Sequence, residues 1–253
     1  MTPSAQEASR FLQELALPDF GPQLEALTES PALEAGRDQS LLVGAGVVAF
    51  TRGVDAQRRQ DLANATLLAQ LAAGKLATDP EDVLGWYRAY QKVLAHVGFA
   101  VQDSGFQEFH TRGQSFETHE AILQVAGIAL GASPSALALI TATLQALKGD
   151  DKFITLFERQ SKASKVARFQ ITLVSEAPDA AEAGFQVNLM AFSLHAAREL
   201  VQVLLARWTE EEMTFRHARH VVTVSPQLLD STRRTVADRL AVVANDFIKE
   251  LPL

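Results

Sequence analysis

The segment "AILQVAGIALGASPSALALITATLQAL", residues 121–147, runs for 27 positions without a charged side chain. A single helix that crosses a bilayer needs about 20 consecutive apolar residues without a break. The stretch Gly131–Pro134 interrupts this run, because glycine and a Ser-Pro pair end one helix and start another. The segment therefore predicts a hairpin of two helices, at about residues 116–130 and 134–147, and no membrane-spanning helix.

The second helix of this hairpin is apolar around most of its circumference. Leu137, Ile140 and Leu144 lie on one face, and Leu139 lies on another. A helix of this kind is buried on more than one side. We expect the protein core, a second subunit or a lipid bilayer to cover it, so these four leucine and isoleucine side chains are candidates for an interface.

Helical spacing and capping residues predict further helices elsewhere in the chain. They are two short acidic helices within 4–29, one helix at about 54–76, one from about 80 to 96, a short one at 151–160 and a long one from Ser225-Pro226 to the C-terminus.

A change to period-two alternation indicates strands in the second half of the sequence. The expected strands lie at 166–175, 185–194, about 200–208 and about 213–224. In the first half, "LLVGAGVVAF" predicts a buried strand at about 41–50, and residues 97–110 fit a bent strand or a small hairpin.

Together these elements predict an α+β fold, in which a helix-rich N-terminal half packs on a mainly antiparallel sheet. The sheet is a meander over about 165–224, and a long C-terminal helix closes it. We expect one domain over residues 1–253. Its parts are an acidic helical segment at 1–38, a mostly helical half at 41–160, and the meander with the C-terminal helix at 165–253.

Composition excludes several classes of function. The net charge is −7, and residues 1–40 hold seven acids and two bases, so we expect no nucleic-acid partner. The chain has no cysteine, which excludes disulfides and thiolate chemistry. The first residues lack a basic region followed by an apolar stretch, so no secretory signal is visible. Cytoplasmic location is the default expectation, with leaderless export as the alternative.

Three short motifs resemble a cofactor-binding, a metal-binding and a catalytic site, but each is better explained by a structural role. Gly44 and Gly46 follow an apolar run as in a dinucleotide-binding loop, but Ala49 stands where a third glycine would be, so we expect no cofactor. His217 and His220 lie within the strand predicted at about 213–224, and positions three apart on a strand point to opposite faces, so we expect no metal site.

The third motif, "GQSFETHE", contains Ser115, Glu117, His119 and Glu120, which could supply a nucleophile and a base. The same residues suit the polar first turn of a helix, where acidic side chains favour the positive end of the helix dipole. We favour the helix start and assign no catalytic residue.

Aromatic side chains concentrate in "GWYRAYQKV". Trp86 and Tyr90 are four positions apart, so a helix presents them together, as an interface anchor or as part of the core. The stretch "DLANATLLAQLAAGKL", followed by "WYRAY", resembles a group of microbial sequences of no established activity over about residues 45–110. The resemblance has no family name and implies no catalytic residues.

Two classes of function, with a third alternative, follow from these features. The first is a non-catalytic interaction or self-assembling protein that forms a homo-oligomer through the apolar hairpin or a sheet edge. The second is a membrane-active or secreted virulence-type protein whose hairpin at 121–147 releases and inserts at a membrane surface. The third is an enzyme or small-molecule binder with a site that the sequence does not reveal.

Overall fold

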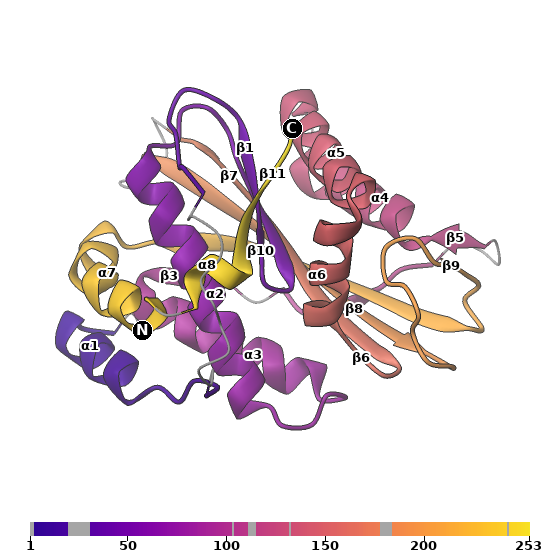
Figure 1. Cartoon of the computed structure of the whole chain (residues 1–253), viewed down its shortest axis with the longest axis horizontal. Coiled ribbons are helices and arrows are strands. Elements are labelled where there is room, and N and C mark those ends of the chain that lie inside the picture. Colours follow the sequence, from indigo (N-terminus) through magenta and orange to yellow (C-terminus); the bar gives the residue numbers. More distant parts are fainter. Residues whose placement is uncertain are drawn as a thin grey trace.

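A sheet runs through the middle of the structure, and helices lie on both of its faces (Figure 1). The computed structural model describes residues 3–19, 31–102, 104–110, 115–131, 133–177, 184–241 and 243–253. The strands in these residues are β1 Gln39–Val43, β2 Gly46–Phe50, β3 Phe99–Gln102, β4 Gln107–Glu108, β5 Phe116–Glu117, β6 Lys162–Ala163, β7 Val166–Glu176, β8 Phe185–Ala196, β9 Arg207–Trp208, β10 Met213–Val224 and β11 Ile248–Leu251.

The main sheet has the order β11-β1-β2-β7-β8-β10-β3. The pairing of β2 with β7 is parallel, and the other neighbours in this order pair antiparallel. Strands β7, β8 and β10 form its centre, in register over long stretches that include Phe169 opposite Phe192 and Phe192 opposite His217. The α+β class predicted from the sequence is confirmed.

Two helical layers cover the sheet. The described helices are α1 Ala5–Glu14, α2 Ala56–Leu76, α3 Val83–Val97, α4 Thr118–Leu130, α5 Pro134–Gly149, α6 Asp151–Ser161, α7 Pro226–Leu240 and α8 Ala244–Phe247. Helices α1, α2, α3 and α7 lie on one face, and α4, α5 and α6 lie on the other (Figure 1). The helices predicted in the N-terminal half are thus divided between the two faces.

Both faces of β7 and β8 are buried along most of their length. On β7, Val166 and Val174 point into the core beneath α2 and α3, whereas Phe169 and Ile171 point into the core beneath α4 to α6. Because the side chains of a strand alternate between faces, a strand with two apolar faces needs a helical layer on each side. This requirement sets the three-layer arrangement.

Two polar positions of the β7 alternation, Gln170 and Thr172, are buried as well. Gln170 is 1% exposed, and its amide joins a hydrogen-bond chain between the sheet and two helices. Gln70 Nε2 on α2 donates to Gln170 Oε1 at 3.0 Å, and Gln170 Nε2 donates to the Tyr87 hydroxyl on α3 at 3.4 Å. Buried amides are tolerated where their hydrogen bonds are made, so this chain fixes the α2/α3 layer to the sheet.

The strand predicted at 41–50 is a hairpin of β1 and β2. Gly44 has a φ of +52°, a left-handed conformation that favours glycine. The side chain of Gln70 fills the space beside it and accepts a hydrogen bond from Ala45 N at 2.9 Å. The glycines therefore make a turn against α2 and leave no room for a cofactor phosphate.

Of two further predictions about the strands, one is corrected and one is narrowed to a single alternative. The third meander strand, expected at 200–208, is reduced to β9, which pairs with β5 outside the main sheet, so β8 and β10 are direct neighbours. Residues 97–110 form β3 and β4, which follow one another antiparallel along β10, so of the two predicted alternatives the structure has the interrupted strand and not the small hairpin. Apolar runs of this length fit a strand and a packed loop equally, and tertiary pairing decides between them.

The long C-terminal helix is also corrected. Helix α7 begins at Pro226, as predicted, but ends at Leu240 and is followed by the short α8 and by β11. Phe247 still packs in the core, from α8, and β11 pairs with β1. This pairing gives β1 a hydrogen-bonded neighbour on its second edge. A longer α7 would not provide these hydrogen bonds. The second acidic helix, predicted within 20–29, falls outside the described residues.

Arg59 on α2 is fully buried and binds four backbone or side-chain oxygens. Its guanidinium donates to Val54 O at 2.9 Å, to Gln39 Oε1 at 3.1 Å, to Arg37 O at 2.8 Å and to Thr51 O at 2.9 Å. These acceptors lie at the open end of the β1–β2 hairpin, where β1 begins and β2 ends. One side chain therefore joins the start of α2 to the hairpin.

We expect Arg59→Met to lower the free energy of unfolding by roughly 3 kcal/mol or more, because each buried acceptor left without a donor costs about 1–3 kcal/mol. Urea unfolding followed by circular dichroism measures the loss. The matched control is Arg52→Met, whose side chain is 75% exposed and which should change stability by no more than about 0.5 kcal/mol. Equal unfolding midpoints for the two variants would contradict this role of Arg59.

Candidate functional site

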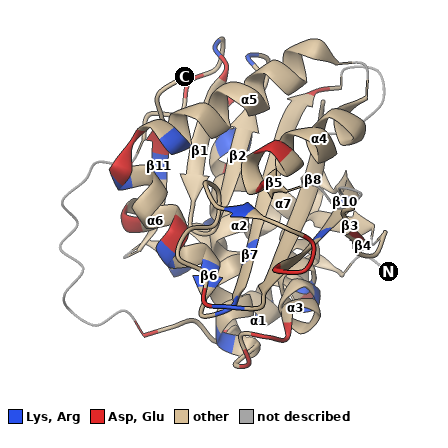
Figure 2. Ribbon diagram, turned by 90° about the vertical axis from the view of Figure 1, so that its right-hand side faces the viewer, with Lys and Arg blue, Asp and Glu red and all other residues tan. Residues whose placement is uncertain are grey.

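The α4–α5 hairpin forms an outer layer over one face of the sheet. The run of 27 residues without charge, 121–147, supplies nearly all of it. In Figure 2 both helices are tan along most of their length. Helix α4 contacts β8, and α5 contacts β2 and β11. The hairpin predicted from the sequence is confirmed, and its tip lies at Gly131–Pro134.

The inner side of the hairpin is buried against the sheet. Its fully or nearly buried aliphatic side chains are Ile122, Val125, Leu139, Ile140, Leu144 and Leu147. They belong to one apolar cluster with Phe169 and Ile171 of β7 and Phe192 of β8. The second helix of the hairpin is therefore covered on its inner side by its own chain.

The six residues predicted as an interface all contact their own chain. Leu139, Ile140 and Leu144 are buried, and Leu137 is half-buried against the same cluster. Trp86 and Tyr90 are buried in the other layer, with their rings stacked at 5.3 Å between centroids. Their use by a partner stays a prediction, and in this fold it requires these side chains to be uncovered first.

At its tip, the hairpin is bound by Arg219 of β10. Arg219 Nη1 donates to Ile128 O and Ala129 O, each at 3.3 Å, and so satisfies carbonyls at the C-terminal end of α4. A groove of about 370 Å³ lies beside this contact, between α4 and the β3–β10 edge. Ile128 and Val221 line the groove and are 76% and 59% exposed. The tip thus presents apolar side chains to solvent.

In its middle, the hairpin is bound to the sheet by two hydroxyls. Ser40 Oγ on β1 and Thr143 Oγ1 on α5 lie 2.7 Å apart in a fully buried position. Thr143 donates its one hydroxyl proton to Leu139 O at 2.7 Å, so Ser40 is the donor of the contact between the two elements.

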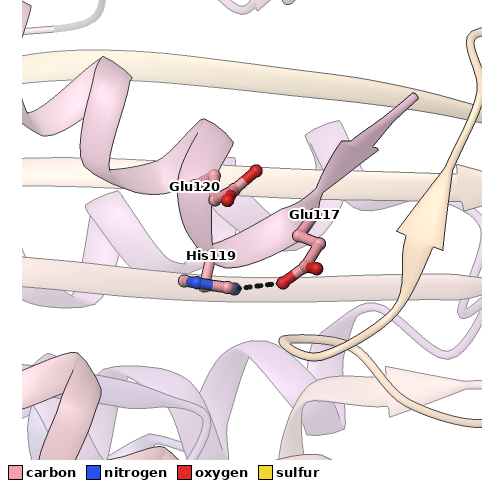
Figure 3. A group of neighbouring side chains, drawn as sticks. All are labelled: Glu117, His119 and Glu120. Carbon is pink, nitrogen blue, oxygen red and sulfur yellow. Dashed lines mark ion pairs between the residues drawn. The ribbon is translucent and has the colours of Figure 1, made fainter. Parts of the chain in front are cut away.

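At its base, where the charge-free run begins and ends, the hairpin carries an ionic cluster (Figure 3). His119 Nδ1 on α4 lies 3.4 Å from Glu117 Oε2, and Lys148 Nζ on α5 lies 3.0 Å from His119 Nε2. Arg207 of β9 reaches Glu117 Oε1 at 3.3 Å. Four elements of the chain therefore meet at one polar network.

The same cluster has the composition of a metal site. Ligand atoms of Glu117, His119 and Glu120 lie within 4.8 Å of one another. The ammonium of Lys148 faces one imidazole nitrogen of His119, and a metal ion there would have to displace that cation. We therefore assign the cluster an ionic role. Ser115 is exposed, and within the described part of the chain no hydrogen bond joins it to His119.

The two histidines of β10 lie on opposite faces of the strand, as predicted. His220 is buried, with Nδ1 at 3.2 Å from Gln102 O. His217 lines the groove beside α4, where partial burial lowers the pKa of its imidazole. Their separation across the sheet is that expected of positions i and i+3 on a strand, so they do not form a joint metal site.

A second, smaller pocket of about 160 Å³ holds Ser193, His195, Glu81 and Arg216. Burial, with a smaller effect of the Arg216 cation, lowers the pKa of His195. A serine nucleophile needs a base within hydrogen-bonding reach. Among the residues that the structure describes, no hydrogen bond joins Ser193 to His195, so the pocket gives the enzyme hypothesis no paired nucleophile and base.

Sequence reasoning did not connect with the hairpin four residues that bind it: Ser40, Lys148, Arg207 and Arg219. Lys148 carried a signal, because it is the first charge after the charge-free run. The other three lie 90 to 103 residues along the sequence from their partners, and no local pattern links them to the hairpin.

No protein-family model matches the chain, and no curated protein matches it, in keeping with a sequence that resembles no named family. Among solved structures, the chain is similar to the Evf virulence factor, with a TM-score of 0.37 and 11% identity over 97% of this chain and 91% of that one. It is also similar to the activated Cyt2Ba monomer from Bacillus thuringiensis subsp. israelensis, with a TM-score of 0.30 and 16% identity over 66% of this chain and 93% of that one. Likeness at these TM-scores establishes neither a shared fold nor a shared function.

Neither helix of the hairpin reaches the length and apolarity of a membrane span, and the same holds for every other helix within the described residues.

Two isoleucines of the hairpin form a matched pair for mutation. Ile140→Ala should lower the free energy of unfolding by about 2–5 kcal/mol, because it leaves a cavity at a fully buried position. Ile128→Ala should change it by no more than about 0.5 kcal/mol, because that side chain is mostly in solvent. Urea unfolding midpoints test the difference. A similar loss for both variants would show that the hairpin is not seated as described.

Proposed function

We propose that this is a membrane-active protein, whose α4–α5 hairpin leaves the sheet and lies in the interface of a lipid bilayer. The observation that carries the proposal is that one continuous segment without charge, 121–147, forms the outer layer of one face of the sheet. Because the segment is continuous in sequence, it can move away from the sheet while it stays attached at both ends, and no other element has to leave its place.

The two helical layers differ in how they are held, which supports release of this one. The α2/α3 layer is joined to the sheet by buried polar groups, among them Arg59, Gln70 and Tyr87. The hairpin is held in its middle by apolar contacts and the Ser40–Thr143 hydrogen bond, and its charged contacts lie at the tip and the base. A polar group that loses its hydrogen bonds on transfer to lipid costs much free energy, whereas an apolar side chain is buried about equally well in a protein core and in lipid.

The lengths of the helices favour a position in the plane of the membrane. At about 1.5 Å per residue, the 13 residues of α4 and the 16 residues of α5 extend about 20 and 24 Å. The hydrocarbon core of a bilayer is about 30 Å thick. A hairpin of this length is too short to cross the core, so we place it along the interface.

Burial energies keep the hairpin closed in water. Each of its six buried aliphatic side chains contributes about 1.5–3 kcal/mol of burial, so full exposure of the set costs roughly 9–18 kcal/mol. A bilayer replaces that burial. The exposed Ile128 at the tip is the first apolar side chain that a membrane would meet. We expect uncharged lipids to be the better partner, since the net charge of −7 repels an anionic surface.

Membrane activity of this kind is the behaviour expected of a secreted virulence-type or toxin-type protein. Self-assembly, the other function predicted from the sequence, would follow the same release, because the predicted interface side chains Leu139, Ile140 and Leu144 of the hairpin are buried until then. Light scattering with and without vesicles measures that homo-oligomer.

A disulfide between hairpin and sheet tests the proposal. In the double variant Ser40→Cys/Thr143→Cys, the sulfur atoms take the places of oxygens that lie 2.7 Å apart, close enough for bond formation. We expect the oxidised variant to release at least about tenfold less dye from phosphatidylcholine vesicles than its own reduced form, since a tethered hairpin cannot reach the lipid.

The chain has no cysteine of its own, so the engineered pair forms the one disulfide that the variant can make, and mass spectrometry confirms it. Wild-type protein treated with the same oxidant and reductant is the matched control and should be unaffected by both. Equal dye release by the oxidised and reduced variants would refute the movement of the hairpin. Absence of binding and release by the wild-type protein would refute membrane activity itself.

A further inference from the structure

The two ends of the charge-free hairpin meet at one histidine. His119 lies in the first turn of α4, and Lys148 lies in the last turn of α5. Lys148 Nζ is 3.0 Å from His119 Nε2. This contact joins the beginning of the apolar run to its end, and it is the point at which the hairpin closes on itself.

The direction of this hydrogen bond is fixed by the chemistry of lysine. An ammonium group has three donors and no acceptor, so Nε2 of His119 must accept. The imidazole that accepts at Nε2 is neutral and carries its proton on Nδ1, which faces Glu117 Oε2 at 3.4 Å without forming a hydrogen bond. The imidazole side chain is 17% exposed, so solvent screens the contact only in part.

Resting on the function proposed above, we propose that His119 is an acid-sensitive latch, which holds α5 to α4 while neutral and releases the α5 end of the hairpin when protonated. A protonated imidazole has two donors and no acceptor, so the bond to Lys148 is lost. Two cations then face each other at the distance of a hydrogen bond and repel.

Charges from four elements face the latch, and together they decide which side opens. Glu117 on β5 and Glu120 on α4 attract the imidazolium, and both lie N-terminal to or at the start of α4. Arg207 on β9 is bound to Glu117, which offsets part of its own repulsion. Lys148 on α5 is the cation in direct contact. Protonation therefore keeps the histidine on the α4 side and drives α5 away.

The direction of the pH effect follows. Histidine is the side chain that ordinarily changes charge between pH 5 and 8. A neutral ring holds the hairpin closed, and protonation of the ring in acid removes this contact from the closed state. Acidification therefore favours release, and a compartment more acidic than the cytoplasm would promote membrane binding.

Binding to phosphatidylcholine vesicles, measured by flotation at pH 7.5 and pH 5.5, tests the latch. We expect wild-type protein to bind on the order of tenfold more tightly at the lower pH, the change that corresponds to one charge-assisted hydrogen bond. His119→Gln keeps a neutral acceptor at both pH values and should lose the difference. His119→Lys carries a permanent charge and should bind tightly at both. His110→Gln alters an exposed histidine and should keep the wild-type difference.

The outcomes separate the latch from the proposed function. Wild-type binding of equal strength at both pH values overturns the latch and leaves membrane activity standing. If nothing binds at either pH, membrane activity fails, and hydrogen exchange of the α5 amides without lipid decides the latch. Corrected for the intrinsic effect of pH, exchange should be faster at pH 5.5 in the wild type and unchanged in His119→Gln. Equal exchange in both proteins would overturn it.

Discussion

The structure depends on a sheet whose central strands are apolar on both faces. Strands β7 and β8 point phenylalanine, isoleucine and leucine side chains toward one helical layer, and valine and leucine side chains toward the other. Neither face can be left to water, so neither helical layer is an optional addition. Any function that moves a layer must therefore supply an apolar surface to replace it, on the sheet side as well as on the helix side.

The two layers cover the sheet with different kinds of contact. This difference is why we propose that the α4–α5 hairpin can move and that the α2/α3 layer stays in place. Beneath α2 and α3, the buried amides of Gln70 and Gln170 and the hydroxyl of Tyr87 form a continuous hydrogen-bond chain. Burial also raises the pKa of Tyr87, so this hydroxyl stays a donor. Beneath α4 and α5 the contacts are mainly aliphatic and aromatic, which lipid can imitate.

Local signals in the sequence determined more of the helices than of the sheet. The starts of α5 and α7 follow from Ser-Pro pairs, and the break at Gly131–Pro134 divides the apolar run correctly, because caps and turns act over a few residues. The pairing of β1 with β11 and the turn at Gly44 depend on partners that lie far away in the chain, such as Gln70. The same holds for the site: the sequence identified the hairpin, but the contact of His119 with Lys148 spans 29 positions.

The order of the elements along the chain has a consequence for synthesis. The hairpin ends at Gly149, whereas β7 and β8, on which it packs, follow at 166–196. A ribosome adds roughly 5–20 residues per second, so the hairpin emerges several seconds before its seat exists. During that interval the newly made segment needs a chaperone or remains in the exit tunnel, and a nearby membrane competes for it. The affinity for lipid that we propose for the hairpin of the folded protein thus also acts on the nascent chain.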